Sequence, residues 1–351
     1  MVEASKELRA TQKERLCGED AVIKESKEGF HCQCKYSDIP IVWTETIKAV
    51  PQGPAKMPFI VAHEFFDALP IHAFQVVEVP PTQQPATPSG SPRSASSNTS
   101  SITRQWREMV VSPTPPGTTH ADLGTPAAER HDGAPVPEFQ MTLSPTATRH
   151  ALAVPEASPR YRALRSTPGA LIEVCPDAAL YASDFAARIG GSSQHPKPQP
   201  SGAALVLDYG PADTVPANTL RGIRRHRRVS PFSEPGRVDL SADVDFVALA
   251  EAATRASPGV EVHGPVEQAA FLEAMGIRER GEMLARMVRE SSASGGSDSE
   301  KEARAREIER AWKRLVDRGP DGMGRIYKAL AILPENDGRR RPVGFGGDVA
   351  A

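Results

Sequence analysis

Apolar runs that end in acidic residues constrain the fold of this chain most strongly. Phe59-Ile60-Val61-Ala62 leads toward Glu64 and Asp67, and Ala203-Ala204-Leu205-Val206-Leu207 leads directly into Asp208. Continuous apolar runs of this length are typical of strands that a parallel sheet buries on both faces. We therefore expect two buried strands, each with carboxylates at its carboxyl end.

Helical patterns alternate with these strands. A strand is predicted over 169–174, stopped by Pro176, and another over 260–262. Helical faces are formed by Ala178, Ala182, Phe185 and Ile189, by Phe246, Leu249, Ala250 and Ala253, and by Phe271, Leu272 and Met275. Ser299-Glu300-Lys301-Glu302 is interpreted as a capping box that opens a last helix, with Ile308, Ala311, Trp312 and Leu315 inside. The alternation indicates an open, mostly parallel α/β sheet.

The first residues resemble the end of a strand that enters a helix. Ser5 is a candidate N-cap for a helix that includes Leu8 and Gln12, and Val2-Glu3 precede it. The segment has neither the apolar core of a signal peptide nor the arginine-rich, acid-poor pattern of a transit peptide.

Acids thus follow three predicted strands: Glu3, Glu64 with Asp67, and Asp208. Ligands of open α/β sheets bind beyond the carboxyl ends of the strands. An early acid in a nucleotide-binding sheet can accept hydrogen bonds from ribose, and Glu64 with Asp67 could orient a cationic or proton-losing substrate. The alternative is that these acids face water or cap the next helix.

Proline-rich stretches interrupt the packed regions. The chain has 33 prolines and 39% hydrophobic residues, which favours a core broken by poorly ordered segments over a uniform globule. Residues 80–101 and 112–137 are predicted to be such insertions. Between them, 104–111 alternates like a strand with Trp106 and Met109–Val111 buried, and it can pair with 138–143.

Several classes of function are disfavoured. The net charge of -2 gives no general attraction to nucleic acid or anionic membranes, and no apolar run is long enough to span a bilayer. Four cysteines exclude a disulfide scaffold, and Cys17 with His31-Cys32-Gln33-Cys34 is interpreted as free thiols, with zinc as the weaker alternative. The basic run Arg221–Arg228 indicates a solvated or acid-paired face; a grip on phosphate or an acidic partner is the alternative.

Taken together, several segments resemble the MidA-like family of S-adenosylmethionine-dependent methyltransferases. They are Val2–Gln12, Ala62–Phe74 (AHEFFDALPIHAF), Ile172–Pro176, Asp208–Gly210, Thr219–Gly222, Asp239–Phe246, Gly264–Ile277 and Met323–Leu330. The segment from Glu64 to Pro70 is the most specific of these. The mitochondrial members of the family are protein arginine methyltransferases that assist assembly of respiratory complex I.

The resemblance implies a Rossmann-like α/β methyltransferase fold, S-adenosyl-L-methionine as cofactor, and symmetric dimethylation of an arginine in a complex I subunit. It implies that Glu64 and Asp67 are catalytic, that Glu3 binds the cofactor's ribose, and that Asp208 and Tyr209 line the substrate side. Asp243 and Asp245 are predicted to be helix caps rather than substrate contacts. It further implies a location in the mitochondrial matrix, a protein partner and a possible homodimer, without nucleic acid, stable membrane insertion or a metal.

One departure from the family leaves an alternative open. The glycine-rich cofactor loop on the first strand should precede Glu3, so we expect that strand and loop to be missing here. A non-catalytic assembly or scaffold protein that keeps the fold is therefore the alternative function. The expected division of the chain is 1–79 and 138–290 for the methyltransferase domain, 80–137 for the insertion, 291–299 for a linker, 300–333 for a helix and closing segment, and 334–351 for a flexible tail.

Overall fold

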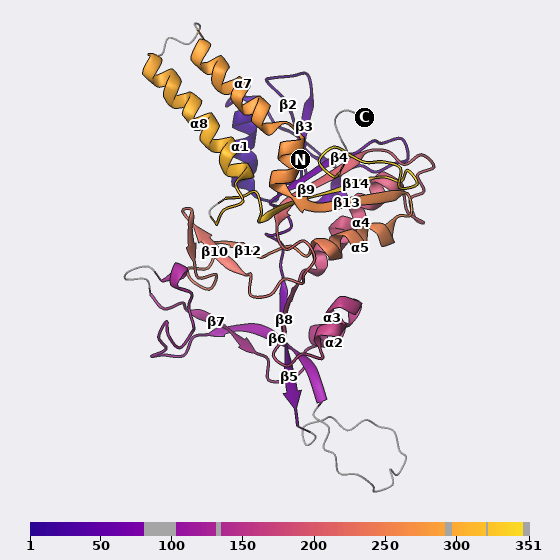
Figure 1. Ribbon diagram of the computed structural model, residues 1–351. Coiled ribbons are helices and arrows are strands. Elements are labelled where there is room, and N and C mark those ends of the chain that lie inside the picture. The colour runs from indigo at the N-terminus through magenta and orange to yellow at the C-terminus, as the bar shows by residue number, and fades with distance from the viewer. Residues whose placement is uncertain (81–102, 131–134, 292–296, 321, 347–351) are drawn as a thin grey trace. The chain divides into compact units, whose positions relative to one another are not determined.

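The computed structural model describes residues 1–80, 103–130, 135–291, 297–320 and 322–346 (Figure 1). The chain divides into two compact units, Met1–Lys56 and Met57–Ala351. Parts of three segments predicted to be disordered or flexible lie outside the described residues: 81–102 and 131–134 of the insertion, 292–296 of the linker, and 347–351 of the tail.

The first unit begins with the helix that the sequence predicts. Helix α1 spans Lys6–Cys17, and the Ser5 hydroxyl accepts a hydrogen bond from the Leu8 N–H at its start. Just before the helix, Val2 forms an isolated parallel bridge with Thr44. The expected helix is therefore present, but a single bridge and not a strand precedes it.

A three-stranded antiparallel sheet completes the first unit. Its order is β1-β2-β3, with bounds Lys24–Ser26, Gly29–Gln33 and Pro40–Trp43, and a 3-10 turn, η1, follows at Ile47–Ala49. The Trp43 side chain is buried, and its indole N–H donates to Oε1 of Gln12 at 2.8 Å. This bond fastens α1 to the sheet.

The main sheet of the second unit contains both predicted acid-ended strands. Its order is β13-β14-β9-β4, with bounds Val260–Glu267, Tyr327–Pro334, Ala203–Tyr209 and Phe59–His63. Only β4 and β9 run parallel; the other two pairings are antiparallel. The α/β class is confirmed, but the expectation of a mostly parallel sheet is wrong, because β14 returns between β13 and β9.

Strand β4 is less buried than its apolar run predicts. Ala62 is 5% exposed, whereas Phe59 and Val61 are 76% and 70% exposed. β4 is the last strand of this sheet in the described residues, so one of its edges has no neighbouring strand in that sheet. The prediction of burial on both faces is wrong for Phe59 and Val61.

A second four-stranded sheet is antiparallel throughout. Its order is β7-β6-β5-β8, with bounds Phe139–Leu143, Thr103–Pro113, His72–Val79 and Leu171–Val174. The predicted pairing of 104–111 with 138–143 is confirmed, and Trp106 is buried with Phe74 and Ile172 in the core of this sheet. Of the three residues predicted to be buried at 109–111, Val111 is instead 60% exposed.

Part of the predicted insertion is ordered. Strand β6 continues to Pro113, and a 3-10 turn, η3, covers Ala127–Glu129. The Glu129 side chain is buried and pairs with Arg228, which lies on the small antiparallel sheet β11-β10-β12. The bounds of that sheet are Arg227–Val229, Arg221–Arg224 and Asp239–Ser241.

The helix over 176–190 follows its predicted pattern, whereas two residues predicted on buried helical faces farther along, Met275 and Ala311, are exposed. Helix α4 (Pro176–Gly190) buries Ala178, Ala182, Phe185 and Ile189 as predicted, and it packs beside α5 (Phe246–Ala256). The remaining helices are α2 (Arg149–Ala153), α3 (Pro159–Leu164), α6 (Gln268–Ala274), α7 (Ile277–Glu290) and α8 (Asp298–Val316), with a 3-10 turn, η4, at Pro155–Ala157. α7 and α8 lie side by side (Figure 1).

The capping box of α8 lies two residues earlier than predicted. The Ser297 hydroxyl accepts from the Glu300 N–H, and the Glu300 carboxylate accepts from the Ser297 N–H. Ser299 is already inside the helix. The predicted pair, Ser299 with Glu302, has the required spacing of three residues, but Ser297 with Glu300 has the same spacing and forms the reciprocal bonds.

Part of the predicted tail packs on helix α6. Of the predicted tail, residues 334–346 are described, and the Phe345 ring packs on Phe271 at 5.4 Å between centroids. None of the helices in the described ranges combines the length and the apolar character that crossing a bilayer requires.

Candidate functional site

The site forms where the two parallel strands end. His63 on β4 pairs with Leu207 on β9, and the Glu64 N–H donates to the Leu207 carbonyl at 3.0 Å. Both strands therefore end at one edge, as the sequence predicts. That edge carries Glu64 and Asp67 after β4, and Asp208 with Tyr209 at the end of β9.

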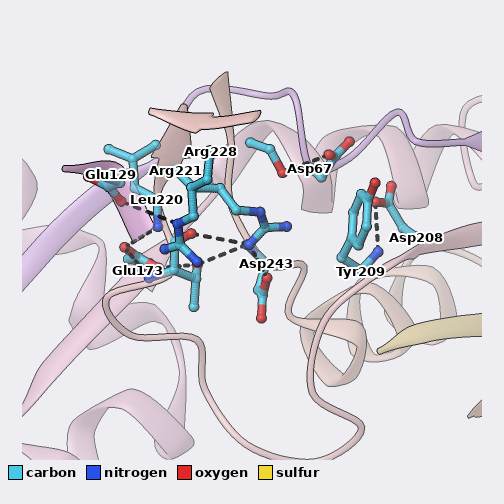
Figure 2. Close-up of polar contacts among 11 residues, drawn as sticks. Asp67, Glu129, Glu173, Asp208, Tyr209, Leu220, Arg221, Arg228 and Asp243 are labelled. Carbon is cyan, nitrogen blue, oxygen red and sulfur yellow. Dashed lines mark hydrogen bonds and ion pairs between the residues drawn. The ribbon is translucent and has the colours of Figure 1, made fainter. Parts of the chain in front are cut away.

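Asp208 lies behind this edge. Its side chain is fully buried, with Oδ2 accepting from the N–H groups of Phe65 and Phe66 at 3.1 and 2.9 Å and Oδ1 accepting from the Tyr209 N–H at 2.9 Å. Burial, with the nearby charge of Asp67, raises the pKa of Asp208 to about 7. Asp208 thus fixes the turn that presents Glu64 and Asp67. Figure 2 shows its hydrogen bond with Tyr209 and the neighbouring Asp67.

One carboxylate oxygen of Asp67 accepts a hydrogen bond, and the other has no hydrogen-bond partner among the described residues. Oδ2 accepts from the Ser241 hydroxyl at 2.9 Å, while Oδ1 is buried without a hydrogen-bond partner among the described residues. Burial raises the pKa of Asp67; the Ser241 hydrogen bond opposes the shift and the charge of Glu64 adds to it. A buried acceptor without a donor is costly, so it marks a position where a donor can bind.

Glu64 is exposed but held in place. Its backbone adopts a left-handed conformation, with φ of 47°, and Oε1 accepts from the Tyr327 hydroxyl at 2.6 Å. The Tyr209 hydroxyl lies 3.5 Å from the same oxygen. Tyr327 and Tyr209 are directly opposed on β14 and β9, and their ring centroids are 4.0 Å apart.

Arg221 is the cation of the site. Its guanidinium lies 5.0 Å from the centroid of the Tyr209 ring and forms an ion pair of 2.6 Å with Asp243. Its charge opposes the upward shift of the Asp67 pKa. The site therefore already accommodates one guanidinium between an aromatic ring and carboxylates, which is the environment that an arginine side chain favours.

Buried Glu173 holds the loop that carries Arg221. Its carboxylate accepts from the Thr219 N–H at 2.9 Å, from the Thr219 hydroxyl, and from the Leu220 N–H at 3.2 Å (Figure 2). Of the two predicted helix caps, Asp245 is confirmed, because it accepts from the Ala248 N–H at the start of α5. Asp243 does not cap a helix; its carboxylate pairs with Arg221 instead.

Two further arginines of the basic run are paired with acids. Arg224 forms an ion pair with Glu234, and Arg228 pairs with Glu129 at 3.2 Å. Arg225 and His226 form the turn of the hairpin, both with positive φ. The prediction of an acid-paired face is confirmed for Arg221, Arg224 and Arg228.

Glu3 belongs to the first unit, where its carboxylate holds the start of α1. Oε1 accepts from the Ser5 N–H at 3.0 Å and Oε2 accepts from Nε2 of Gln12 at 3.3 Å. Each oxygen keeps further acceptor capacity. In the same unit Cys17, Cys32 and Cys34 are free thiols, as is Cys175 in the second.

Sequence reasoning missed three residues of the site: Tyr327, Ser241 and Glu173. The first of them had a detectable signal, since Tyr327 precedes the apolar run Ala329–Leu333, which forms β14. Ser241 and Glu173 act through contacts between segments far apart in the chain, which no local pattern reveals.

Residues 1–266 match a protein family described as "Putative S-adenosyl-L-methionine-dependent methyltransferase". The chain belongs to this family. The resemblance drawn from Glu64–Pro70 and the other segments is thereby confirmed, as is S-adenosylmethionine as the cofactor on which the family depends.

Curated relatives of this chain are named "Protein arginine methyltransferase NDUFAF7, mitochondrial". The rat protein is 30% identical over 352 residues, which cover 100% of this chain and 62% of the relative. The human protein is 28% identical over 298 residues, which cover 85% of this chain and 49% of the relative. The chain thus spans about half to three-fifths of the length of these relatives.

A solved structure shares the fold. A Burkholderia thailandensis protein crystallised with bound S-adenosyl-homocysteine superimposes with a TM-score of 0.50 at 19% identity, covering 87% of this chain and 57% of that chain. This likeness supports the α/β methyltransferase fold.

The residues of this chain fit one part of such a cofactor. The carboxylate of Glu3, placed after a strand-like residue and before a helix, is the acceptor type that binds ribose hydroxyls. In the described ranges, no Gly-x-Gly turn follows a strand directly.

Proposed function

We propose that the protein is an S-adenosylmethionine-dependent protein arginine N-methyltransferase, and that this chain carries its arginine-binding residues. The observation that supports this most directly is the pair Glu64 and Asp67 beside Tyr209. One carboxylate is exposed and oriented by Tyr327, and the other keeps a buried oxygen without a donor. A guanidinium offers five N–H donors in a plane, which suits two carboxylates at fixed positions.

The two acids have different tasks in this proposal. Glu64 binds the incoming guanidinium and aims one of its nitrogens, since the Tyr327 hydroxyl limits where the Glu64 carboxylate can point. Asp67 is the proton acceptor, because a nitrogen that gains a methyl group must lose a proton. The raised pKa of Asp67 suits that task. S-adenosylmethionine supplies the methyl group as a sulfonium.

Asp208 acts as a positioning residue in this proposal, in place of the substrate contact expected from the sequence. Its three backbone hydrogen bonds hold the turn on which Glu64 and Asp67 lie. Tyr209 keeps the expected role of lining the substrate side, since its side chain is partly exposed and its hydroxyl lies beside the Glu64 carboxylate.

The finer substrate assignment follows the family resemblance. We infer symmetric dimethylation of an arginine in a respiratory complex I subunit, in the mitochondrial matrix, by an enzyme that can form a homodimer. The names of the curated relatives, which specify arginine methylation and mitochondria, support the reaction and the compartment.

Methyl transfer tests the proposal. The purified chain and its Glu64→Gln variant would be incubated with S-adenosylmethionine labelled in the methyl group and a mitochondrial protein extract, followed by amino-acid analysis for methylarginine. Label in dimethylarginine with the original chain, and its loss in the variant, would support the proposal. Label in lysine or in small molecules would contradict it.

Calorimetry separates the enzyme from the scaffold alternative. Titration with S-adenosylmethionine should give binding that Glu3→Ala weakens and Glu64→Gln leaves intact. A chain that folds but binds no cofactor at millimolar concentration would favour the assembly or scaffold protein.

A further inference from the structure

Two histidines and a glutamate converge on the second sheet, apart from the residues assigned to arginine. Phe74 on β5 pairs with Glu108 on β6, so His72, two residues before Phe74, lies diagonally opposite Glu108 on the same face. His150 comes from the first turn of α2, which packs on β6. Three elements thus bring one side chain each to a single point.

The distances among the three side chains suit a metal ion. Nδ1 of His72 lies 2.8 Å from Oε1 of Glu108, Nδ1 of His150 lies 3.4 Å from the same oxygen, and one ligand atom of each residue lies within 4.8 Å of the others. Bonds to zinc of about 2.0–2.1 Å in a tetrahedron place the ligand atoms roughly 3.3 Å apart. Small side-chain adjustments would therefore close the set around one ion.

A second layer of contacts orients the carboxylate. The Thr148 hydroxyl donates to Oε2 of Glu108 at 2.5 Å and accepts from the Ala151 N–H at 3.1 Å, which also caps α2. The Glu108 side chain is only 11% exposed, and its Oε1 points toward the two imidazoles. Hydrogen bonds that fix the ligating carboxylate are a regular feature of metal sites.

Solvent can reach this cluster from the side of the two histidines. The His150 side chain is 58% exposed, and that of His72 is 30% exposed, whereas Glu108 forms the floor. We propose that His72, Glu108 and His150 bind a divalent transition-metal ion, zinc in the first instance, with its fourth position open to solvent. Two imidazoles and one carboxylate are an established ligand set for zinc, with water as the fourth ligand.

The ion would join α2 to the sheet. α2 is five residues long and starts directly after the loop that follows β7. A helix of that length has little stability by itself, so a bond from His150 to an ion held by β5 and β6 would fix its position. This consequence does not depend on methyl transfer.

Zinc titration of the whole chain tests the site. Calorimetry with zinc chloride would be run on the original chain and on His150→Ala, His72→Ala and Glu108→Gln, with His195→Ala as the control at an exposed histidine on a loop of the same unit. We expect one ion per chain, at least a tenfold loss of affinity in each of the three variants, and no change in the control. Zinc should also raise the Tm of the original chain more than that of His150→Ala.

Cobalt distinguishes this site from the cysteines. Thiolate ligands give cobalt an intense charge-transfer band in the near ultraviolet, which imidazole and carboxylate ligands do not. Cobalt bound without that band, and lost in His150→Ala, would support the proposal. A thiolate band, equal zinc affinity in His150→Ala and the original chain, or no zinc binding at all would overturn it. Because the His150 side chain is exposed, the His150→Ala variant should fold like the original chain. Circular dichroism would compare the secondary structure of the two.

Discussion

The hydroxyl of Tyr327 donates a 2.6 Å hydrogen bond to Oε1 of Glu64, a residue 263 positions earlier in the chain. The bond joins the first residue of β14 to the turn after β4, across the neighbouring strand β9. It makes the orientation of the exposed carboxylate depend on the last strand of the sheet.

Tyr327→Phe should therefore impair catalysis while leaving the fold intact. Losing a hydrogen bond to a charged group costs about 1.5 kcal/mol or more, which corresponds to roughly a tenfold lower kcat. Methyl-transfer assays and cofactor calorimetry would measure this; the affinity for S-adenosylmethionine should not change. Tyr209→Phe is the matched control, since its hydroxyl lies farther away, at 3.5 Å, and its loss should cost less. Equal effects of the two variants would refute the role given to Tyr327.

Asp67→Asn should abolish transfer and leave the chain at least as stable at neutral pH. The amide cannot accept the proton, and loss of a general base lowers rates by roughly 10²–10⁴. Burial disfavours the charged form of Asp67, and the charge of Glu64 adds to this, so a neutral side chain of the same shape relieves both. Activity and the urea midpoint at pH 7.5 give the two readouts. Turnover within threefold of the original would remove Asp67 from the reaction.

Asp208 should make the protein less stable as pH rises from 4 to 7. Its folded-state pKa of about 7 lies above the ordinary value of 3.8, so between these values the folded chain holds a proton that the unfolded chain has released. The stabilisation is complete below pH 4 and is lost as pH rises through 7, by at most about 1.4 kcal/mol per pH unit. Urea unfolding of Asp208→Asn should show a shallower fall over that range than the original chain; parallel curves would exclude the shift.

Glu173→Ala should destabilise the second unit by about 3 kcal/mol. The substitution leaves the part-buried N–H groups of Thr219 and Leu220 without an acceptor, and each such loss costs roughly 1–3 kcal/mol. The free energy of unfolding in urea measures it. Glu138→Ala makes the same change at an exposed glutamate and should stay within about 0.5 kcal/mol of the original chain. A Glu173→Ala chain as stable as this control would show that the loop does not depend on Glu173.

Ser297→Ala should weaken the start of α8 by about 1 kcal/mol, because the N-cap hydroxyl bond is lost. Ser299→Ala, two residues away and inside the helix, should have little effect. Amide hydrogen exchange over the first turn of α8 resolves the two variants. Faster exchange in Ser299→Ala than in Ser297→Ala would restore the capping box expected from the sequence.

The strand ends of the site could be predicted from the sequence because they depend on local patterns. An apolar run followed by acids gave β4 with Glu64 and β9 with Asp208, and the shared edge follows from their parallel pairing. The burial of Asp208 was not predictable in the same way. Nothing local distinguishes a carboxylate that faces substrate from one that accepts three backbone N–H groups.

Most features that could not be predicted from the sequence depend on contacts between segments far apart in the chain. The direction of β14 depends on the helices that precede it, so its apolar run did not reveal an antiparallel strand between β13 and β9. The exposed apolar residues Phe59 and Val61 carry the pattern of a buried strand, although their exposure depends on the neighbours of β4. The offset of the α8 cap is a local error of two residues.

The left-handed backbone of Glu64 has one more consequence. At this position the backbone conformation favours glycine, whereas the proposed reaction needs a carboxylate. Glycine would adopt a φ of 47° freely, whereas a residue with a Cβ makes the folded state less stable by roughly 1–2 kcal/mol there. A redesign guided by folding stability alone would replace Glu64 with glycine early, and would delete the carboxylate that Tyr327 holds. Thermostabilised versions of this protein should therefore be selected with position 64 kept fixed.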